Sequence, residues 1–304
     1  MQGRHRYSTS QLFNFAKDSY LERTSRPIYA IVFLLPFIIF YEFGTILINT
    51  DVLNQSQVRV VAFVWLQNLL EYLGFGSRVA WVAPPLVVVV ILIALQLVSR
   101  KQWRFCLGDV WPMAVECIFL AVPLIVLSLF LNRPAKLQSD ISRYDNKAIR
   151  IQAEAPPSHL LAAEHSLLLS NIGTGSIEPG SQSLLANIVT GIGAGIYEEL
   201  VFRLILICLL MLFFQDLLRL THKNSIILSV LISAALFSAH HHVIFVDGQF
   251  GRTVAFTWTE FGFRTIAGIY FAILFAIRGF GVAAGTHAFY DIIATIVNAV
   301  FFQQ

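Results

Sequence analysis

Long apolar runs alternate with short polar segments along most of this 304-residue chain. A helix that spans a bilayer needs about 20 mostly apolar residues. Six runs have about this length, at 27–49, 79–99, 110–131, 226–246, 261–277 and 280–302. A seventh stretch, 183–214, is longer than one span needs. Glycines near its centre predict a break, with a short amphipathic piece before it and a full span from about Ile196.

Residues 58–75 form an eighth, ambiguous candidate. They are apolar on average but contain Arg59, Gln67, Asn68 and Glu71. Such a segment could lie in the interface, re-enter, or cross the membrane inside a bundle. The pattern therefore predicts an all-α, polytopic transmembrane helical bundle with seven or eight spanning helices. The distribution of Lys and Arg does not fix its orientation, because seven and eight spans put the long polar stretch on opposite sides.

Residues 132–182 are the one long polar stretch, with five basic residues and a Pro-Pro pair. At this length they are expected to form an extramembrane loop or a small subdomain. The chain then divides into 1–131, a leader with the first transmembrane helices, the loop 132–182, and a transmembrane core at 183–304. Residues 1–26 are basic and partly amphipathic, so we expect them on the membrane surface.

The composition narrows the class of protein. Hydrophobic residues make up 57% and charged residues 13%, whereas a soluble domain carries roughly 25% charged residues. An ordinary soluble enzyme is therefore excluded. The three cysteines lack metal or disulfide spacing, and the basic residues are scattered, so neither a zinc knuckle nor nucleic-acid binding is indicated.

Three of the last predicted spans contain clusters of polar residues. Placing charged side chains within a bilayer costs free energy, so these clusters indicate a functional or structural role. The clusters are Glu198, Glu199 and Arg203 in GAGIYEELVFR, His240, His241 and His242 in LFSAHHHVIF, and His287 and Asp291 in GTHAFYD. Residues four apart share a helix face, which pairs Glu199 with Arg203 and leaves Glu198 free to face a cavity. The same spacing relates His287 to Asp291, and Phe237 to His241.

These groups suit a hydrolase that lacks a covalent nucleophile. A carboxylate and an imidazole can take a proton from water, and a second imidazole with a carboxyl group can stabilise an oxyanion. Asp291 can donate only when protonated, and as an anion it would orient His287. Three readings stay open at this point: structural pairing of helices, a transporter or proton relay, and a zinc site at Glu198, His241 and His287.

The motifs EExxxR, FxxxH and HxxxN/D occur here in one order, as Glu198-Glu199-Arg203, Phe237-His241 and His287-Asp291. Over residues 183–302 the chain resembles the CAAX-protease and bacteriocin-processing family of glutamic intramembrane proteases. The resemblance implies catalytic roles for Glu198 as base, for His241 as its helper and for His287 with Asp291 as the oxyanion site. It gives Glu199, Arg203 and Phe237 supporting roles. A family member that keeps this site but works as a catalytically silent membrane regulator is a further alternative. Many members have Asn where this chain has Asp291.

The same resemblance implies a metal-free mechanism with no cofactor, zinc being possible but not favoured. It also implies a membrane-anchored protein or peptide as substrate, and a multi-pass protein of the bacterial inner membrane. The HExxH, GxGD and GxSG patterns of other intramembrane proteases are absent. Outside the clusters we expect Glu42 and Glu116 to be packing groups, and Arg264 and Arg278 to extend to opposite interfaces.

Overall fold

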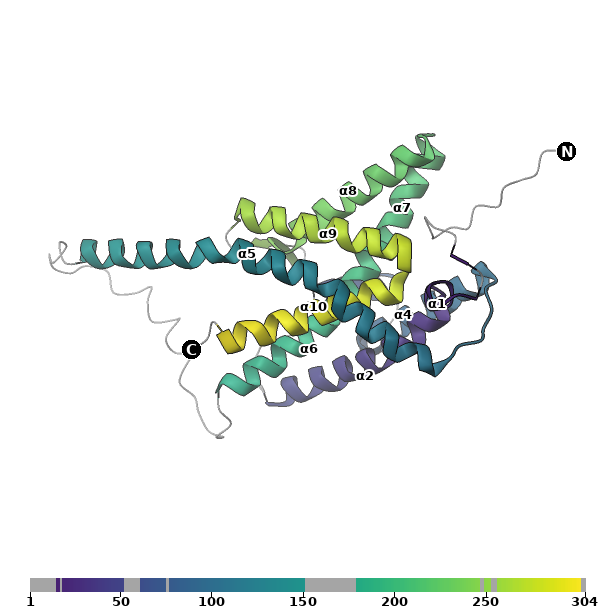
Figure 1. Ribbon diagram of the computed structural model, residues 1–304, viewed down its shortest axis with the longest axis horizontal. Coiled ribbons are helices and arrows are strands. Elements are labelled where there is room, and N and C mark those ends of the chain that lie inside the picture. The colour runs from purple at the N-terminus through teal and green to yellow at the C-terminus, as the bar shows by residue number, and fades with distance from the viewer. Residues whose placement is uncertain are drawn as a thin grey trace.

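The computed structural model describes residues 15–16, 18–51, 61–74, 77–150, 179–246, 249–252 and 256–301. It confirms a helical bundle (Figure 1), to which one antiparallel hairpin of β1 (Val243–Val246) and β2 (Gln249–Arg252) is added. The helices are α1 (Tyr20–Thr24), α2 (Pro27–Asp51), α3 (Val61–Tyr72), α4 (Ser77–Ser99), η1 (Leu107–Asp109), α5 (Val110–Arg150), α6 (Pro179–Glu199), η2 (Leu200–Leu206), α7 (Ile207–Met211), η3 (Leu212–Leu217), α8 (His222–His240), α9 (Trp258–Arg278) and α10 (Phe280–Phe301).

Six helices in the described part of the chain are long and apolar enough to cross a membrane. The apolar stretch Ala83–Ser99 of α4 is a shorter, seventh candidate, so the number is roughly consistent with the seven or eight predicted. The ambiguous stretch contains α3, which has 12 residues. At about 1.5 Å per residue α3 reaches well short of the roughly 30 Å hydrocarbon core, so it cannot cross alone. It packs against α4 and α6 instead.

The predicted break around the glycines of α6 is wrong. The helix continues to Glu199 and passes directly into η2, a π-helical segment. Gly195 lies against the backbone of α10, where an added Cβ would be 2.5 Å from the nitrogen of Ala288. An added Cβ would also meet the side chain of Asp291 in α10 at Gly191 and the ring of Tyr41 in α2 at Gly193. The glycines therefore allow helices to approach closely, which a sequence cannot distinguish from a helix break.

Gly195→Ala is expected to destabilise the protein. The new Cβ meets backbone atoms that cannot rotate away, so α6 and α10 must separate, and overpacking of this kind costs about 1–3 kcal/mol. Gly262 in α9 is a matched control, because its added Cβ meets nothing within 4 Å. Gly262→Ala should leave the melting temperature in detergent unchanged or slightly raised. Equal losses in both variants would contradict close helix contact at Gly195.

Two other predicted boundaries differ from the structure. The apolar run 226–246 does not form one helix, since α8 ends at His240 and β1 follows after a turn. The polar stretch 132–182 begins as helix, because α5 continues to Arg150. Residues 151–178 lie outside the described residues. The three-part division of the chain stays a prediction.

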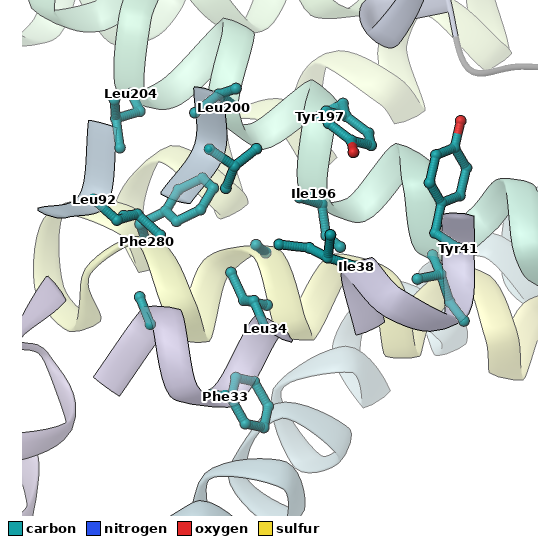
Figure 2. Packing of buried hydrophobic residues seen from close by; sticks show 14 of the residues in the cluster. Phe33, Leu34, Ile38, Tyr41, Leu92, Ile196, Tyr197, Leu200, Leu204 and Phe280 are labelled. Carbon is teal, nitrogen blue, oxygen red and sulfur yellow. The ribbon is translucent and has the colours of Figure 1, made fainter. Parts of the chain in front are cut away.

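Helix α10 lies at the centre of the packing. It contacts α6, α5, α2 and α9, and α8 packs against α9, as the arrangement in Figure 1 shows. The largest buried apolar cluster joins α2, α4, α6, η2 and α10 (Figure 2). Its fully buried members include Leu34, Ile196 and Leu200. This core fixes α6 against α10, and these two helices carry Glu198, Glu199, His287 and Asp291, four of the eight polar residues singled out above.

Arg278 does not extend to an interface, so that expectation is wrong. It is buried and donates two hydrogen bonds to the carboxylate of Glu116, at 2.6 and 2.8 Å, and one to Oγ1 of Thr24. This network ties α1, which lies within residues 1–26, to α5 and α9. Nearby, the hydrogen bond from Arg26 lowers the pKa of the Glu22 carboxyl below its ordinary value.

Candidate functional site

A cavity of about 340 Å³ opens between α5, α6, α8, α9 and α10. Its lining includes Glu198, Phe237, His241, His287 and Asp291. These residues come from three helices and are separated by up to 93 positions in sequence. The fold thus brings the polar clusters of the last spans to one cavity. The other two predicted site residues, Glu199 and Arg203, lie beside it.

Glu198 is the common neighbour of three imidazoles. Its Oε1 lies 3.3 Å from Nε2 of His240, and its Oε2 lies 3.8 Å from Nε2 of His241 and 4.0 Å from Nε2 of His287. The carboxylate is almost fully buried, whereas the His241 side chain is 29% exposed. A water molecule in the cavity could therefore contact Glu198 and a histidine at the same time.

Glu199 and Arg203 form a buried pair behind the cavity. Oε1 of Glu199 lies 3.1 Å from Nη1 of Arg203, and both side chains are at most 1% exposed. Arg203 also donates a 3.3 Å hydrogen bond to the carbonyl of Gly268 in α9. Its guanidinium lies 4.1 Å from the ring centroid of Phe237, within cation–π distance. These contacts tie α6 and η2 to α8 and α9.

His287 is held on both sides. Its Nδ1 lies 2.7 Å from Oε1 of Glu199, and its ring stacks on Phe271 with the centroids 4.5 Å apart. The other nitrogen, Nε2, lies 3.6 Å from Oδ2 of Asp291. Because its Nδ1 contacts a carboxylate, the ring orientation is fixed with Nε2 toward the cavity.

The π-helical segment η2 begins directly after Glu199. A π turn disturbs the regular ladder, and such segments often occur at functional sites. The carbonyl of Phe202 within it accepts a 2.7 Å hydrogen bond from Ser233 of α8. In addition, the Phe237 ring meets that of Phe202 edge to face. Phe237 is therefore a packing element that positions α8, and with it the histidines at its end.

The structure places all seven predicted site residues in or beside the cavity. Sequence reasoning missed the closeness of His240 to Glu198 and the stacking of Phe271 on His287. His240 could have been considered because it belongs to the run of three histidines, but the FxxxH motif favoured His241. Arg264 also lines the cavity, where its Nη1 lies 3.6 Å from Oε2 of Glu260. Its side chain is 29% exposed, and its extension to a membrane interface stays a prediction.

A metal could be held by a different set from the one considered above. Ligand atoms of Glu198, His240 and His241 lie within 4.8 Å of one another. Among the described residues, these three are the group that could hold a metal ion. The group contains His240, whereas the set considered from the sequence contained His287.

Comparison with known proteins finds a family model that matches the part of the chain that carries the site. Residues 180–293 match the Rce1-like family, described as type II CAAX prenyl endopeptidase Rce1-like. The matched region extends from the start of α6 into α10 and includes every residue discussed above as catalytic or supporting. The resemblance drawn from the three motifs is confirmed. No curated protein and no solved structure matches the chain.

Proposed function

We propose that this integral, multi-pass membrane protein, whose residues 180–293 match the type II CAAX prenyl endopeptidase Rce1-like family, hydrolyses a peptide bond of a membrane-anchored protein or peptide. We further propose a glutamic-type mechanism in which no covalent intermediate forms. The observation that carries it is the position of Glu198, which is buried and whose Oε2 lies within 4.0 Å of two imidazole nitrogens at one cavity.

In the proposed reaction Glu198 takes a proton from water as its oxygen attacks the carbonyl carbon of the substrate. His241 binds the same water and orients it, since its side chain reaches both Glu198 and the open cavity. Glu198 then gives the proton to the leaving amine, and the C–N bond breaks. Each proton taken up is returned, so the enzyme ends in its starting state.

The oxyanion is proposed to lie beside His287 and Asp291. With Nδ1 of His287 against Glu199, Nε2 can donate only if the ring is an imidazolium. A charged His287 and Arg203 then face the carboxylates of Glu198 and Glu199. The site is balanced in charge when Asp291 is a neutral carboxyl, which can donate to an oxyanion. Buried charges are tolerated when they are paired in this way.

The test is cleavage of a membrane-anchored peptide by the purified protein in lipid bilayers, with products identified by mass spectrometry. His241→Gln removes the imidazole but keeps the side-chain length. It is expected to slow cleavage by about 10²-fold or more, the lower range for an acid–base helper. Cleavage at the wild-type rate in His241→Gln would rule out the assigned helper, and absence of any cleavage would rule out the endopeptidase.

Asp291→Asn is expected to retain hydrolysis, whereas Asp291→Leu, of similar size, should lower kcat by about 10²–10³-fold. The amide donates a hydrogen bond without needing a proton from solution, and leucine donates none. If Asp291 acts instead as an anion that orients His287, both variants lose activity. Steady-state kinetics of the two variants side by side therefore distinguish donor from anion.

The bacterial inner membrane is the proposed location. It is supported by the family resemblance over residues 183–302, together with the six helices of the described chain that are long and apolar enough to cross a membrane. Fractionation of membranes from the source cells, with detection of the protein in the inner-membrane fraction, tests this placement.

A further inference from the structure

One arginine faces the cavity from α9. Glu260, Arg264, Ala267 and Phe271 all line the cavity, and their spacing of three or four residues puts them on one face of the helix. Among the described residues of the lining, Arg264 is the only arginine or lysine. The same wall continues to Phe271, whose ring stacks on His287. A peptide that lies along α9 from the site therefore reaches the guanidinium of Arg264.

The neighbours of Arg264 use only part of its guanidinium. Its contacts with Glu260 and His242, at 3.6 and 3.5 Å, both involve Nη1. The 3.6 Å separation is too long for a hydrogen bond, and the side chains of Glu260 and Arg264 are both partly exposed. Within the described part of the chain these are its polar contacts, so donors on Nε and Nη2 stay available. Two parallel N–H donors of this kind match the two oxygens of a carboxylate.

We propose that Arg264 binds a carboxylate of the substrate and thereby determines which peptides the site accepts. The carboxylate is either the C-terminal group of a peptide or the side chain of an aspartate or glutamate, since both present the same pair of oxygens. This role of Arg264 rests on the proposed function, because it requires that a peptide occupy the cavity beside Glu198 and His241.

Glu260 occupies the place of that carboxylate when no substrate is bound. Its Oε2 lies nearest to Nη1 of Arg264, yet this buried oxygen has no hydrogen-bond partner among the described residues. A loose pair of this kind contributes little free energy. A substrate carboxylate that makes two hydrogen bonds to Arg264 can therefore displace Glu260.

The position of Arg264 assigns it to binding and not to the chemical step. Arg264 lies seven residues before Phe271, which is about 10 Å along α9. Helical side chains also lean toward the N-terminus, which takes the guanidinium further from the level of His287. Arg264 thus contacts a part of the substrate a few residues from the bond that is cut. An interaction that is equal in the ground state and the transition state changes KM and leaves kcat alone.

The test uses a fluorescent peptide with a lipid anchor at its N-terminal end. One pair of peptides ends in either a free carboxylate or an amide. A second pair ends in an amide and carries either glutamate or glutamine at one position, which is varied along the peptide. KM and kcat of the full-length protein are measured in bilayers of a zwitterionic phospholipid, and binding of the same peptides is measured by fluorescence anisotropy.

In the wild type, the carboxylate form of one pair should have a KM at least about 10-fold lower than its neutral partner, the effect of one hydrogen bond to a charged group. Arg264→Met should bring the two KM values together. Lys223→Met is the matched control, because it removes an exposed lysine at the opposite end of α8 from His241, and its KM ratio should equal that of the wild type. The pair that responds identifies the source of the carboxylate.

Glu260→Gln should act in the opposite direction. It removes the competing carboxylate and should lower the KM of the carboxylate form by about 2–5-fold, as expected for an exposed pair. This variant also carries the test if Arg264→Met is not monodisperse, because an unchanged KM would then reject the proposal.

The proposal is overturned if neither pair of peptides is distinguished by the wild type, or if the preference survives in Arg264→Met. Cleavage without any such preference would uphold the endopeptidase and reject the role of Arg264. Binding that prefers the carboxylate form and depends on Arg264, without cleavage of any peptide, would uphold Arg264 and reject the proposed function.

Discussion

Glu198→Gln is expected to reduce cleavage of a membrane-anchored peptide by about 10²–10⁴-fold, the range that acid–base catalysis contributes. Glutamine keeps the size of the side chain and can still accept a hydrogen bond at Oε1, but it cannot take a proton from water. The carboxylate contacts His240 and His241 through polar atoms, and an amide of the same size fills the same space. The shape of the cavity should therefore persist. Single-turnover cleavage by purified variants, quantified by mass spectrometry, measures the loss.

Glu42→Gln is the matched control for that loss. Glu42 is also a carboxylate in a membrane helix, and its Oε1 accepts a 3.2 Å hydrogen bond from the hydroxyl of Tyr197. An amide oxygen can accept the same bond, and Glu42 is not among the residues that line the cavity. Its variant should cleave at the wild-type rate. If the two variants lose activity equally, or neither loses it, Glu198 is not the base.

The spans of this fold could be predicted because length and hydropathy decide whether a helix can lie in a bilayer. The course of the chain through α6 could not. Glycine can break a helix, and it can also let two helices approach closely. Only the positions of Ala288 and Asp291 on α10 show that Gly195 and Gly191 allow close approach. The same limit applies to Arg278, whose partner Glu116 is 162 positions away.

The candidate site was more accessible to sequence reasoning than the packing around it. Spacing of four residues put Glu199 and Arg203 on one face and left Glu198 on another, because helical geometry fixes those directions. The end of α8 was different. Whether His240 or His241 lies nearer Glu198 depends on where the helix stops and on the Phe237 carbonyl that holds the His240 ring. The sequence of three histidines shows neither where the helix ends nor which carbonyl holds the ring.

Arg203→Met is expected to cost about 3–5 kcal/mol in the free energy of unfolding, because it leaves the carboxylate of Glu199 buried without its guanidinium. Methionine fills much of the space but cannot donate to the Gly268 carbonyl. His287 still donates to Oε1 of Glu199 at 2.7 Å, but Oε2 has no hydrogen-bond partner within the described residues, so the charge is compensated only in part. Equilibrium unfolding in mixed micelles, followed by tryptophan fluorescence, measures the change.

Arg264→Met is the matched control, because it removes the arginine of a similar Glu–Arg pair that is partly exposed instead of buried. Arg264 also lies four residues after a glutamate, but the side chains of Glu260 and Arg264 are 44% and 29% exposed and 3.6 Å apart. Exposed pairs contribute about 0–1 kcal/mol, so this variant should unfold almost as the wild type does. Adding Glu199→Gln to Arg203→Met removes the buried charge and should recover part of the lost stability. Equal costs at Arg203 and Arg264, or a double variant less stable than Arg203→Met, would show that the uncompensated carboxylate is not the cause.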